Sequence, residues 1–400
     1  MINKIHVKWF KSIEDVTFEP GIVNVLVGAN GSGKSNLLEA IGVLSAAVHG
    51  RVDDEALLRR GVRPGVPALY KCSFPGIKGP LHISFGAWSN NSSYEVSLFN
   101  PIDDPSPIWR YHTENLQQNQ EKIVGRSHRG KEKQNPEAGL AALKLAEMTD
   151  KDESLHLFND LREFGIYTPN TPVLRGIQPD TQQRQPVGLA GGQLAKALSE
   201  IRRILFKKES KKINRFYSMV RNDALHLIDW AKLFGTASPS NMPLSPSVGS
   251  AEKVIRFTDR YMKTSRNKLT GYDASEGALY VLFHAALAAH PKSPSFFAVD
   301  NADHGLNPRL SQGLFNSICN WYLNSPYSRQ ILLTTHNPSA LDGLPLQNDK
   351  VRLFAVNRTA GGRTVVERII LTNKMKKMAD KGWTLSRLWV MGHLGGIANV

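Results

Sequence analysis

Hydrophobic positions along the chain follow three spacings, and each spacing predicts one kind of element. Mainly apolar runs are typical of buried strands in a central sheet, and they occur at 22–27, 295–300, 330–334 and 351–356. Apolar residues at helical spacing predict helices at 36–48, 137–148, 153–164, 192–207, 214–233, 280–289 and 308–323. Shorter alternating runs predict further strands at 2–7, 16–18, 69–74, 81–85, 94–99, 108–112, 254–262 and 364–371.

Polar, Gly-rich and Pro-rich stretches separate these elements. They predict loops at 52–65, 169–186 and 235–250, and an exposed, mobile segment with a basic run at 114–135. One further helix is expected after residue 371. The order of elements indicates an α/β fold with a mixed central sheet, an antiparallel side sheet and a helical insertion.

We divide the chain into three parts on this pattern. Residues 1–113 hold the first half of the central fold and the side sheet. Residues 114–250 form a mainly helical insertion with a mobile basic loop. Residues 251–400 hold the second half of the central fold.

Composition narrows the setting in which the protein works. The net charge is +15, from 50 Lys and Arg against 35 Asp and Glu, which favours nucleic acid or another polyanion as a partner. A generic basic protein would carry the same charge. The two cysteines, Cys72 and Cys319, are too few for a disulfide framework, which indicates a reducing cytoplasm. No stretch approaches the roughly 18 apolar residues of a membrane span, so no membrane partner is expected.

Candidate chemistry begins directly after the first buried strand. Residues 28–35, GANGSGKS, match the G-x-x-x-x-G-K-[ST] loop in its strand–loop–helix context. Glycines let consecutive backbone N–H groups face an anion, Lys34 supplies a positive charge for phosphates, and the Ser35 hydroxyl is a ligand for Mg²⁺. The residues expected to contact ATP here are Asn30, Gly31, Ser32, Gly33, Lys34, Ser35 and Asn36.

Two later strands end in further candidate site residues. Asp300 closes the apolar strand SFFAVD in the manner of a Walker B motif, where it can share Mg²⁺ with Ser35. His336 follows the next strand and can contact a γ-phosphate or the attacking water. The alternatives are an Asp that merely ends a strand and a structural His.

Another helix start that can bind an anion is predicted at Ser275, Glu276 and Gly277. An ordinary helix cap would look the same. The chain's own loop already supplies a phosphate cradle, so this end is better suited to ATP held by a second copy. Residues 189–193, LAGGQ, resemble a transporter signature more closely. They lie more than 100 residues before Asp300, and we expect them to cap a helix that begins near Gln193.

This ordered set resembles the ATP-binding-cassette-type ATPases of the SMC/RecF/OLD-like group. The shared motifs are FKSI at 10–13, the GANGSGKSN loop, the Ser-Glu-Gly signature, the strand that ends at Asp300 and TTHNP at 334–338. Within that group the chain resembles stand-alone AAA family ATPases of bacterial phage-defence and abortive-infection operons. The resemblance implies a P-loop NTPase with an SMC-head-type fold. It also implies a head-to-tail homodimer or higher oligomer that sandwiches two ATP molecules, with Asn307 at the interface.

One position departs from the family pattern. The residue after the Walker B aspartate is usually a glutamate that polarises the attacking water, and here it is Asn301, which cannot take a proton. Hydrolysis is then slow or triggered by a partner, which we favour. Otherwise Asp303 supplies the carboxylate, or Asn301 is an engineered change that traps ATP.

Two functions follow from these expectations. The first is a nucleotide-dependent dimerising sensor or scaffold for an effector, a nuclease or toxin on another chain, in anti-phage defence. The second is a DNA-repair or chromosome-maintenance ATPase that clamps DNA directly. The tail after residue 363 holds only Glu367 and Asp380 as acidic residues, too few for a nuclease metal site of its own.

Overall fold

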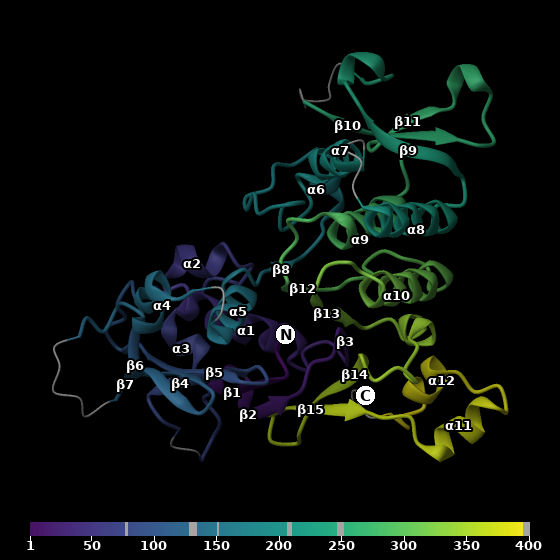
Figure 1. The fold of residues 1–400 in the computed structure, drawn as a ribbon. Coiled ribbons are helices and arrows are strands. Elements are labelled where there is room, and N and C mark those ends of the chain that lie inside the picture. Colours follow the sequence, from purple (N-terminus) through teal and green to yellow (C-terminus); the bar gives the residue numbers. More distant parts are fainter. Residues whose placement is uncertain (77–78, 128–133, 150–151, 206–209, 246–251, 395–400) are drawn as a thin grey trace.

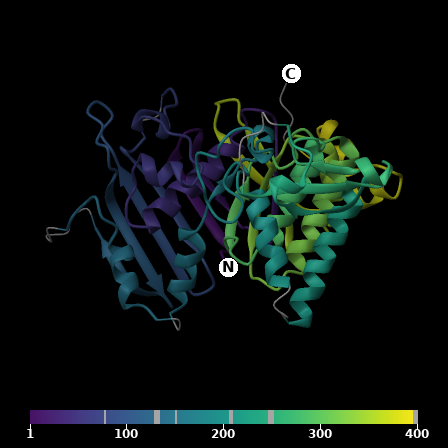
Figure 2. The ribbon, with the colours of Figure 1, turned by 90° about the horizontal axis from the view of Figure 1, so that it is seen from above.

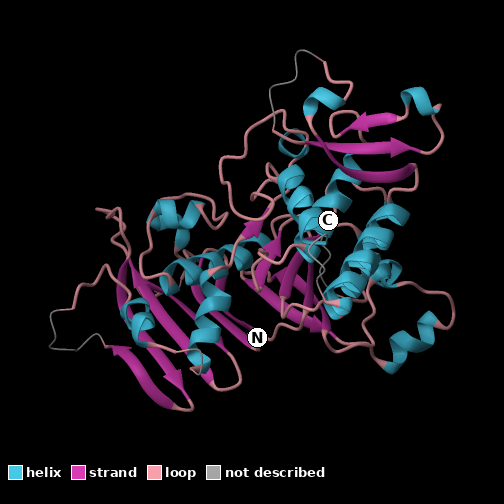
Figure 3. Ribbon diagram, turned by 45° about the horizontal axis from the view of Figure 1, so that its top comes forward, coloured by secondary structure: helices cyan, strands magenta, loops and turns pink. Residues whose placement is uncertain are grey.

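The computed structural model describes residues 1–76, 79–127, 134–149, 152–205, 210–245 and 252–394. In these residues the chain forms three sheets with helices packed between and around them (Figures 1 and 3). The central sheet has the strand order β15-β14-β3-β13-β12-β8, the side sheet β2-β1-β4-β5-β6-β7, and a third, smaller sheet β11-β10-β9. The α/β class, the central sheet and the antiparallel side sheet are therefore as predicted.

The central sheet is built from the predicted apolar runs. Its strands are β3 (Val23–Val27), β8 (Ile166–Tyr167), β12 (Phe296–Val299), β13 (Gln330–Thr335), β14 (Val351–Arg358) and β15 (Thr364–Ile369). All neighbouring pairs are parallel except β14 with β15. The short strand β8 was not predicted, because two residues carry no periodicity.

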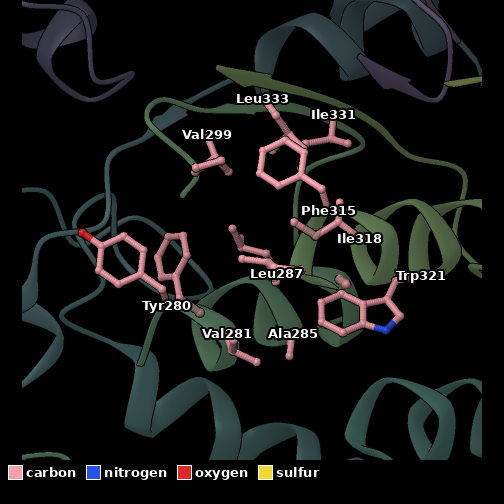
Figure 4. Packing of buried hydrophobic residues seen from close by; sticks show 14 of the residues in the cluster. Tyr280, Val281, Ala285, Leu287, Val299, Phe315, Ile318, Trp321, Ile331 and Leu333 are labelled. Atoms are coloured by element: carbon pink, nitrogen blue, oxygen red, sulfur yellow. The ribbon is translucent and has the colours of Figure 1, made fainter. Parts of the chain in front are cut away.

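Alternate residues of these strands face two separate cores, as expected for a parallel sheet covered on both sides. Val25, Val299 and Leu333 belong to the core that contains α9 (Glu276–Ala289) and α10 (Pro308–Leu323). Figure 4 shows Val299 and Leu333 in this core from close by. Leu26 and Leu332 belong to the other core, together with α1 (Lys34–Val48) and the side sheet.

The side sheet is longer than the sequence pattern indicates. Its strands are β1 (Lys4–Phe10), β2 (Ile13–Phe18), β4 (His82–Trp88), β5 (Ser92–Phe99), β6 (Arg110–Gln118) and β7 (Glu121–Arg126). The prediction of an exposed, mobile segment at 114–135 is wrong as far as residue 126, because Glu114, Leu116 and Val124 are buried. Polar neighbours hide this alternation. Most of the basic run lies in 128–133, outside the described residues.

Several predicted helices and loops need correction. The predicted loop 52–65 contains α2 (Asp54–Leu58), and the predicted strand 69–74 is replaced by α3 (Pro67–Tyr70). The tail forms two helices rather than one, α11 (Asn373–Ala379) and α12 (Leu385–Val390). The remaining helices are α4 (Leu140–Lys144), α5 (Glu153–Arg162), α6 (Thr171–Leu174), α7 (Leu194–Leu205) and α8 (Lys211–Leu227), and short 3-10 turns lie at Leu145–Glu147, Pro239–Asn241, Thr264–Arg266 and Pro338–Gly343.

The third sheet stands beside the long helices α7 and α8 (Figures 1 and 2). Its strands are β9 (Ala231–Ala237), β10 (Val254–Asp259) and β11 (Lys268–Thr270). The predicted helix 214–233 is wrong beyond Leu227, and β9 occupies the start of the predicted loop 235–250. Residues 114–250 hold the helices α4 to α8, but their strands lie in all three sheets, so the three-part division stays a prediction.

Candidate phosphate-binding site

The candidate site lies where three neighbouring parallel strands end. Strand β13 lies between β3 and β12, with Thr335 opposite Val27 and Leu333 opposite Val299. The carboxyl ends of these strands therefore place the loop 28–35, Asp300 and His336 at one edge of the sheet. Ligands of open α/β sheets bind at this edge.

The loop 28–35 has the backbone of an anion cradle. Gly31 and Gly33 have φ values of 77° and 110°, in the left-handed region that favours glycine. At Gly28 a Cβ would lie 2.2 Å from the carbonyl oxygen of Val356, so only glycine fits against β14. Helix α1 starts at Lys34 and points its N-terminus into the loop. The strand–loop–helix context predicted from the sequence is confirmed.

Two buried polar groups in the loop, the Ser32 hydroxyl and the Lys34 ammonium, are incompletely satisfied by the described residues. The Ser32 hydroxyl is buried and has no hydrogen-bond partner in the part of the chain that the structure describes. Lys34 is 7% exposed, and among the described residues its Nζ donates only to the carbonyl oxygens of Gly28 at 2.6 Å and Ala29 at 3.0 Å. Burial lowers the Lys34 pKa, although the charge of Asp300 opposes that shift. Both groups fit a negatively charged ligand in the cradle.

A divalent cation would find two oxygen ligands beside this cradle. The Ser35 hydroxyl donates to Asp300 Oδ2 at 2.9 Å, while Thr334 donates to Oδ1 of the same carboxylate. Neighbouring ligands of octahedral Mg²⁺, each at about 2.1 Å, stand about 3 Å apart. Ser35 and Asp300 therefore fit Mg²⁺, the ion that the sequence predicts. Among the described residues, no group of three or more His, Cys, Asp and Glu residues forms another metal site.

Asn301 is half-buried, whereas Asp303 is buried. Asn301 has a φ of 51°, and its backbone N–H donates to the Thr334 hydroxyl at 2.8 Å, which fixes it beside Asp300. Asp303 is 4% exposed, and its Oδ2 accepts hydrogen bonds from Ser311 at 2.7 Å and Thr335 at 3.0 Å. Burial raises the pKa of Asp303. These contacts favour a positioning role for Asp303, and its catalytic role stays a prediction.

The other predicted site residues lie at the surface. His336 follows β13 and is exposed, while the Asn307 side chain accepts a hydrogen bond from Leu310 N at 2.9 Å and caps α10. Ser275 is exposed at the N-terminus of α9 and makes no side-chain capping bond to its own helix. Its hydroxyl is therefore available to a ligand from outside. Glu276 is instead held by Thr171, and a Cβ on Gly277 would lie 2.7 Å from Leu310.

The sequence interpretation missed three groups that support the cradle. Thr334 holds Asp300, as described above. The Thr364 hydroxyl donates to the Ser32 carbonyl at 3.0 Å and contacts Ser12 Oγ at 2.7 Å, and Asn36 donates to the same Ser12 oxygen at 2.7 Å. Thr364 lies more than 300 residues from the loop in sequence, so no local pattern identifies it. For Ser12, the FKSI motif was the available signal.

A cleft of about 470 Å³ opens beside Asn36 and Ser12, with room for the nucleoside part of a nucleotide. Lys11 and Arg63 line it, and both are held by the carboxylate of Glu39 inside α1. These two positive charges are thus fixed in place before any ligand binds.

The LAGGQ segment is confirmed as a helix-capping loop. Helix α7 begins at Leu194, and Ala197 N donates to the Gln193 carbonyl at 2.9 Å. The backbone N–H groups of Ala190 and Gly192 both donate to Asp180 Oδ2 at 3.1 Å. The chain's own carboxylate thus occupies the anion-binding position of this loop.

Comparison with known proteins identifies a family that matches most of the chain. The family model described as "AAA domain, putative AbiEii toxin, Type IV TA system" matches residues 23–70 and 76–342. The DNA replication and repair protein RecF of Arthrobacter sp. (strain FB24) is 48% identical over 61 residues, a match that spans 15% of each chain.

Solved structures give the fold alone, because their sequences have diverged. An SMC head crystallised with the C-winged helix domain of ScpA has a TM-score of 0.56 at 14% identity, over 94% of this chain and 99% of its own. An SMC head with an extended coiled coil, bound to the C-terminal domain of ScpA from Pyrococcus furiosus, has a TM-score of 0.48 at 13% identity, over 96% and 99% of the two chains. None of the described helices is both long and apolar enough to cross a membrane.

Proposed function

The chain belongs to this family of AAA domains, with the fold of an SMC-type P-loop NTPase head, and we propose that it binds ATP with Mg²⁺ and hydrolyses it slowly. The observation that carries the proposal is the loop 28–35. Within the described parts of the chain, its buried Ser32 hydroxyl lacks a hydrogen-bond partner, and its buried Lys34 ammonium donates only to carbonyl oxygens. A triphosphate would satisfy both groups.

The remaining residues at the carboxyl edge of the sheet would each have a separate role in binding or hydrolysis. Ser35 and Asp300 would hold Mg²⁺, which neutralises charge on the β- and γ-phosphates when bound. Asn301 would orient the attacking water without accepting its proton, and His336 would contact the γ-phosphate. Hydrolysis is slow in this proposal because no carboxylate stands at position 301.

ATP titration of the Lys34→Ala chain tests the binding site. We expect binding to be abolished, because the substitution removes the one ammonium inside the cradle. Lys232→Ala, an exposed change on β9, is the matched control and should leave ATP affinity unchanged. Undiminished ATP binding by the Lys34→Ala chain, confirmed as folded by its thermal melt, would refute the assignment.

We further propose that two copies engage head to tail and act as a sensor or scaffold for a separate effector, a nuclease or toxin, in anti-phage defence. The free Ser275 hydroxyl supports the dimer, and the AbiEii toxin named in the family description supports the setting. The test is a pull-down of the tagged chain with proteins encoded beside it, with and without ATP. An ATP-dependent partner is expected. Its absence under both conditions would oppose the scaffold role.

One observation favours the second candidate, an ATPase that clamps DNA itself. Residues 194–270, which we call the basic lobe, include α7, α8 and the third sheet. The lobe has sixteen Lys and Arg against six Asp and Glu, a net charge of +10 out of the chain's +15. ATP-dependent duplex binding by the isolated protein that falls steeply with salt would support this function over the scaffold.

A further inference from the structure

A second basic cleft lies at the end of α1 farthest from the candidate ATP site. Helix α1 runs for 15 residues, about 22 Å, from Lys34 to Val48. At its far end, α2, the end of α5 and residues 182–184 enclose a cleft of about 610 Å³. We call it the arginine cleft, because its lining includes Arg51, Arg59, Arg60, Arg162 and Arg184.

The carboxylates of the arginine cleft do not balance its guanidinium groups. Asp53 pairs with Arg51 at 2.6 Å, and Glu55 pairs with Arg59. Glu163 is shared, at 3.5 Å from Arg162 Nε and 3.8 Å from Arg184 Nη2. Five guanidinium groups thus face three carboxylates, which leaves an excess of positive charge inside a concave surface.

Arg60 has no carboxylate partner among the described residues, although it is only 5% exposed. Its Nε donates to the Ser45 hydroxyl at 2.7 Å and its Nη1 to the Ala56 carbonyl at 2.8 Å, both neutral acceptors. Burial, followed by the charge of Arg184, lowers the Arg60 pKa to about 10. Buried charges in proteins are normally paired, so this guanidinium has the surroundings of a group that awaits an anion.

Two neighbours of Arg60 are also incompletely satisfied. Arg162 Nε is buried and makes no hydrogen bond, because Glu163 stands too far away at 3.5 Å. Burial lowers the pKa of His49, and the charges of Arg60 and Arg162 lower it further. His49 is therefore neutral at pH 7 and can offer one donor and one acceptor to a polar ligand.

We propose that the arginine cleft binds a phosphorylated small molecule of mononucleotide size. The volume lies in the range of small-ligand pockets, and planar guanidinium groups bind phosphate oxygens in pairs. A continuous nucleic-acid backbone fits less well, because the carboxylates of Asp53, Glu55 and Glu163 interrupt the positive surface. A short anion can contact the arginines without approaching those groups.

The structure also connects this cleft to α9, the helix that begins directly after Ser275. Arg184 comes from the segment whose Leu189 and Ala190 carbonyls accept hydrogen bonds from Thr168 and Asn170. Thr171 next to them donates to Glu276, and Arg175 donates to the Ala274 carbonyl at 3.1 Å. An anion that draws Arg184 inward would therefore stabilise the backbone around Ser275. This regulatory step, unlike binding itself, rests on the proposed role of Ser275.

Calorimetric titration of the full chain with inorganic tripolyphosphate, and separately with ADP, tests the site. All proteins carry Lys34→Ala, which keeps the probes from the loop 28–35 and separates this test from the proposed ATPase. We expect one saturable event per chain, weakened at least tenfold by Arg162→Gln with Arg184→Gln. The control double change Arg110→Gln with Lys122→Gln, at exposed positions of β6 and β7, should have no effect.

A substitution that is expected to tighten binding distinguishes a real binding site from simple loss of the fold. Glu55 is exposed, so Glu55→Gln should fold normally and bind tripolyphosphate more tightly, because it removes a repelling carboxylate. Absence of saturable binding, or equal weakening by the β6 and β7 control, would overturn the proposal. Hydrogen exchange at residues 272–280 should slow when the probe binds, and an unchanged rate there would refute the regulatory step.

Discussion

At the residue scale, Asn301 combines an unusual backbone with an unusual side chain for its position. Its φ of 51° suits Asn or Asp, whereas a longer side chain there costs about 1 kcal/mol. A carboxylate at this position could accept the proton of the attacking water. We expect Asn301→Glu to raise steady-state ATP turnover at least tenfold, and Asn301→Asp to raise it with less strain but a shorter reach.

The control for this prediction is Asn324→Glu, which adds the same charge at the far end of α10. Phosphate release should not change in that protein. Turnover that stays at the wild-type rate in both position-301 variants would show that proton transfer at position 301 does not limit the reaction.

The ionised carboxylate of Glu39 stabilises the fold, and this contribution depends on pH. Burial opposes its ionisation, but hydrogen bonds from Arg63 and Lys11 outweigh that effect and hold the Glu39 pKa below 4.5. A carboxyl with a lowered folded pKa stabilises the fold at higher pH and loses that contribution as pH falls through the folded pKa. Glu39→Gln should therefore lower the free energy of unfolding at pH 7, by about 1–2 kcal/mol, because it weakens the charge-assisted hydrogen bonds to Arg63 and Lys11.

Urea unfolding over a pH series measures this effect. The difference between wild type and Glu39→Gln should narrow as pH falls below 4.5. The exposed change Glu121→Gln should give no difference at any pH. A deficit in Glu39→Gln that is constant with pH would mean that the substitution acts through packing and not through charge.

At the element scale, the edge strand β15 supports the phosphate loop from the side. Thr364→Val keeps the shape of the side chain but removes the hydroxyl that contacts the Ser32 carbonyl and Ser12. Loss of these two buried hydrogen bonds should cost about 1–3 kcal/mol of stability. ATP affinity should fall severalfold, because the loop loses its lateral support.

Thermal melts and ATP titrations check this pair of effects, with Thr258→Val on β10 as the matched change in a different sheet. A lower melting temperature together with an unchanged ATP affinity would show that Thr364 contributes to stability alone.

The elements that form the site are those whose local sequence agrees with their tertiary role. Strands β3, β12 and β13 are buried on both faces, so their apolar runs identify them, and the glycines of the loop 28–35 have no other conformational use. The start of β9 was predicted as helix and its end as loop, because its pairing with β10, and not its own pattern, makes it a strand. Arg60 could not be predicted either, since its environment is assembled from α1, α2, α5 and residues 182–184.

At the scale of the whole molecule, the proposed catalytic unit is larger than one chain. The loop 28–35 and Ser275 belong to different ends of the sequence, and the Ser275 hydroxyl makes no bond to its own helix. A Lys34→Ala chain lacks the loop function but keeps the signature, whereas a Ser275→Arg chain has the reverse defect. Each protein alone should therefore be inactive in ATP hydrolysis.

Mixing the two inactive proteins should restore hydrolysis if the site is shared between copies. In an equal mixture half of the dimers are mixed, and each mixed dimer has one intact site of two, which predicts about a quarter of wild-type turnover. A site completed within one chain would give no recovery at any ratio. Recovery that rises with total protein concentration, and that fails when both proteins carry Ser275→Arg, would identify association of copies as the step that assembles the site.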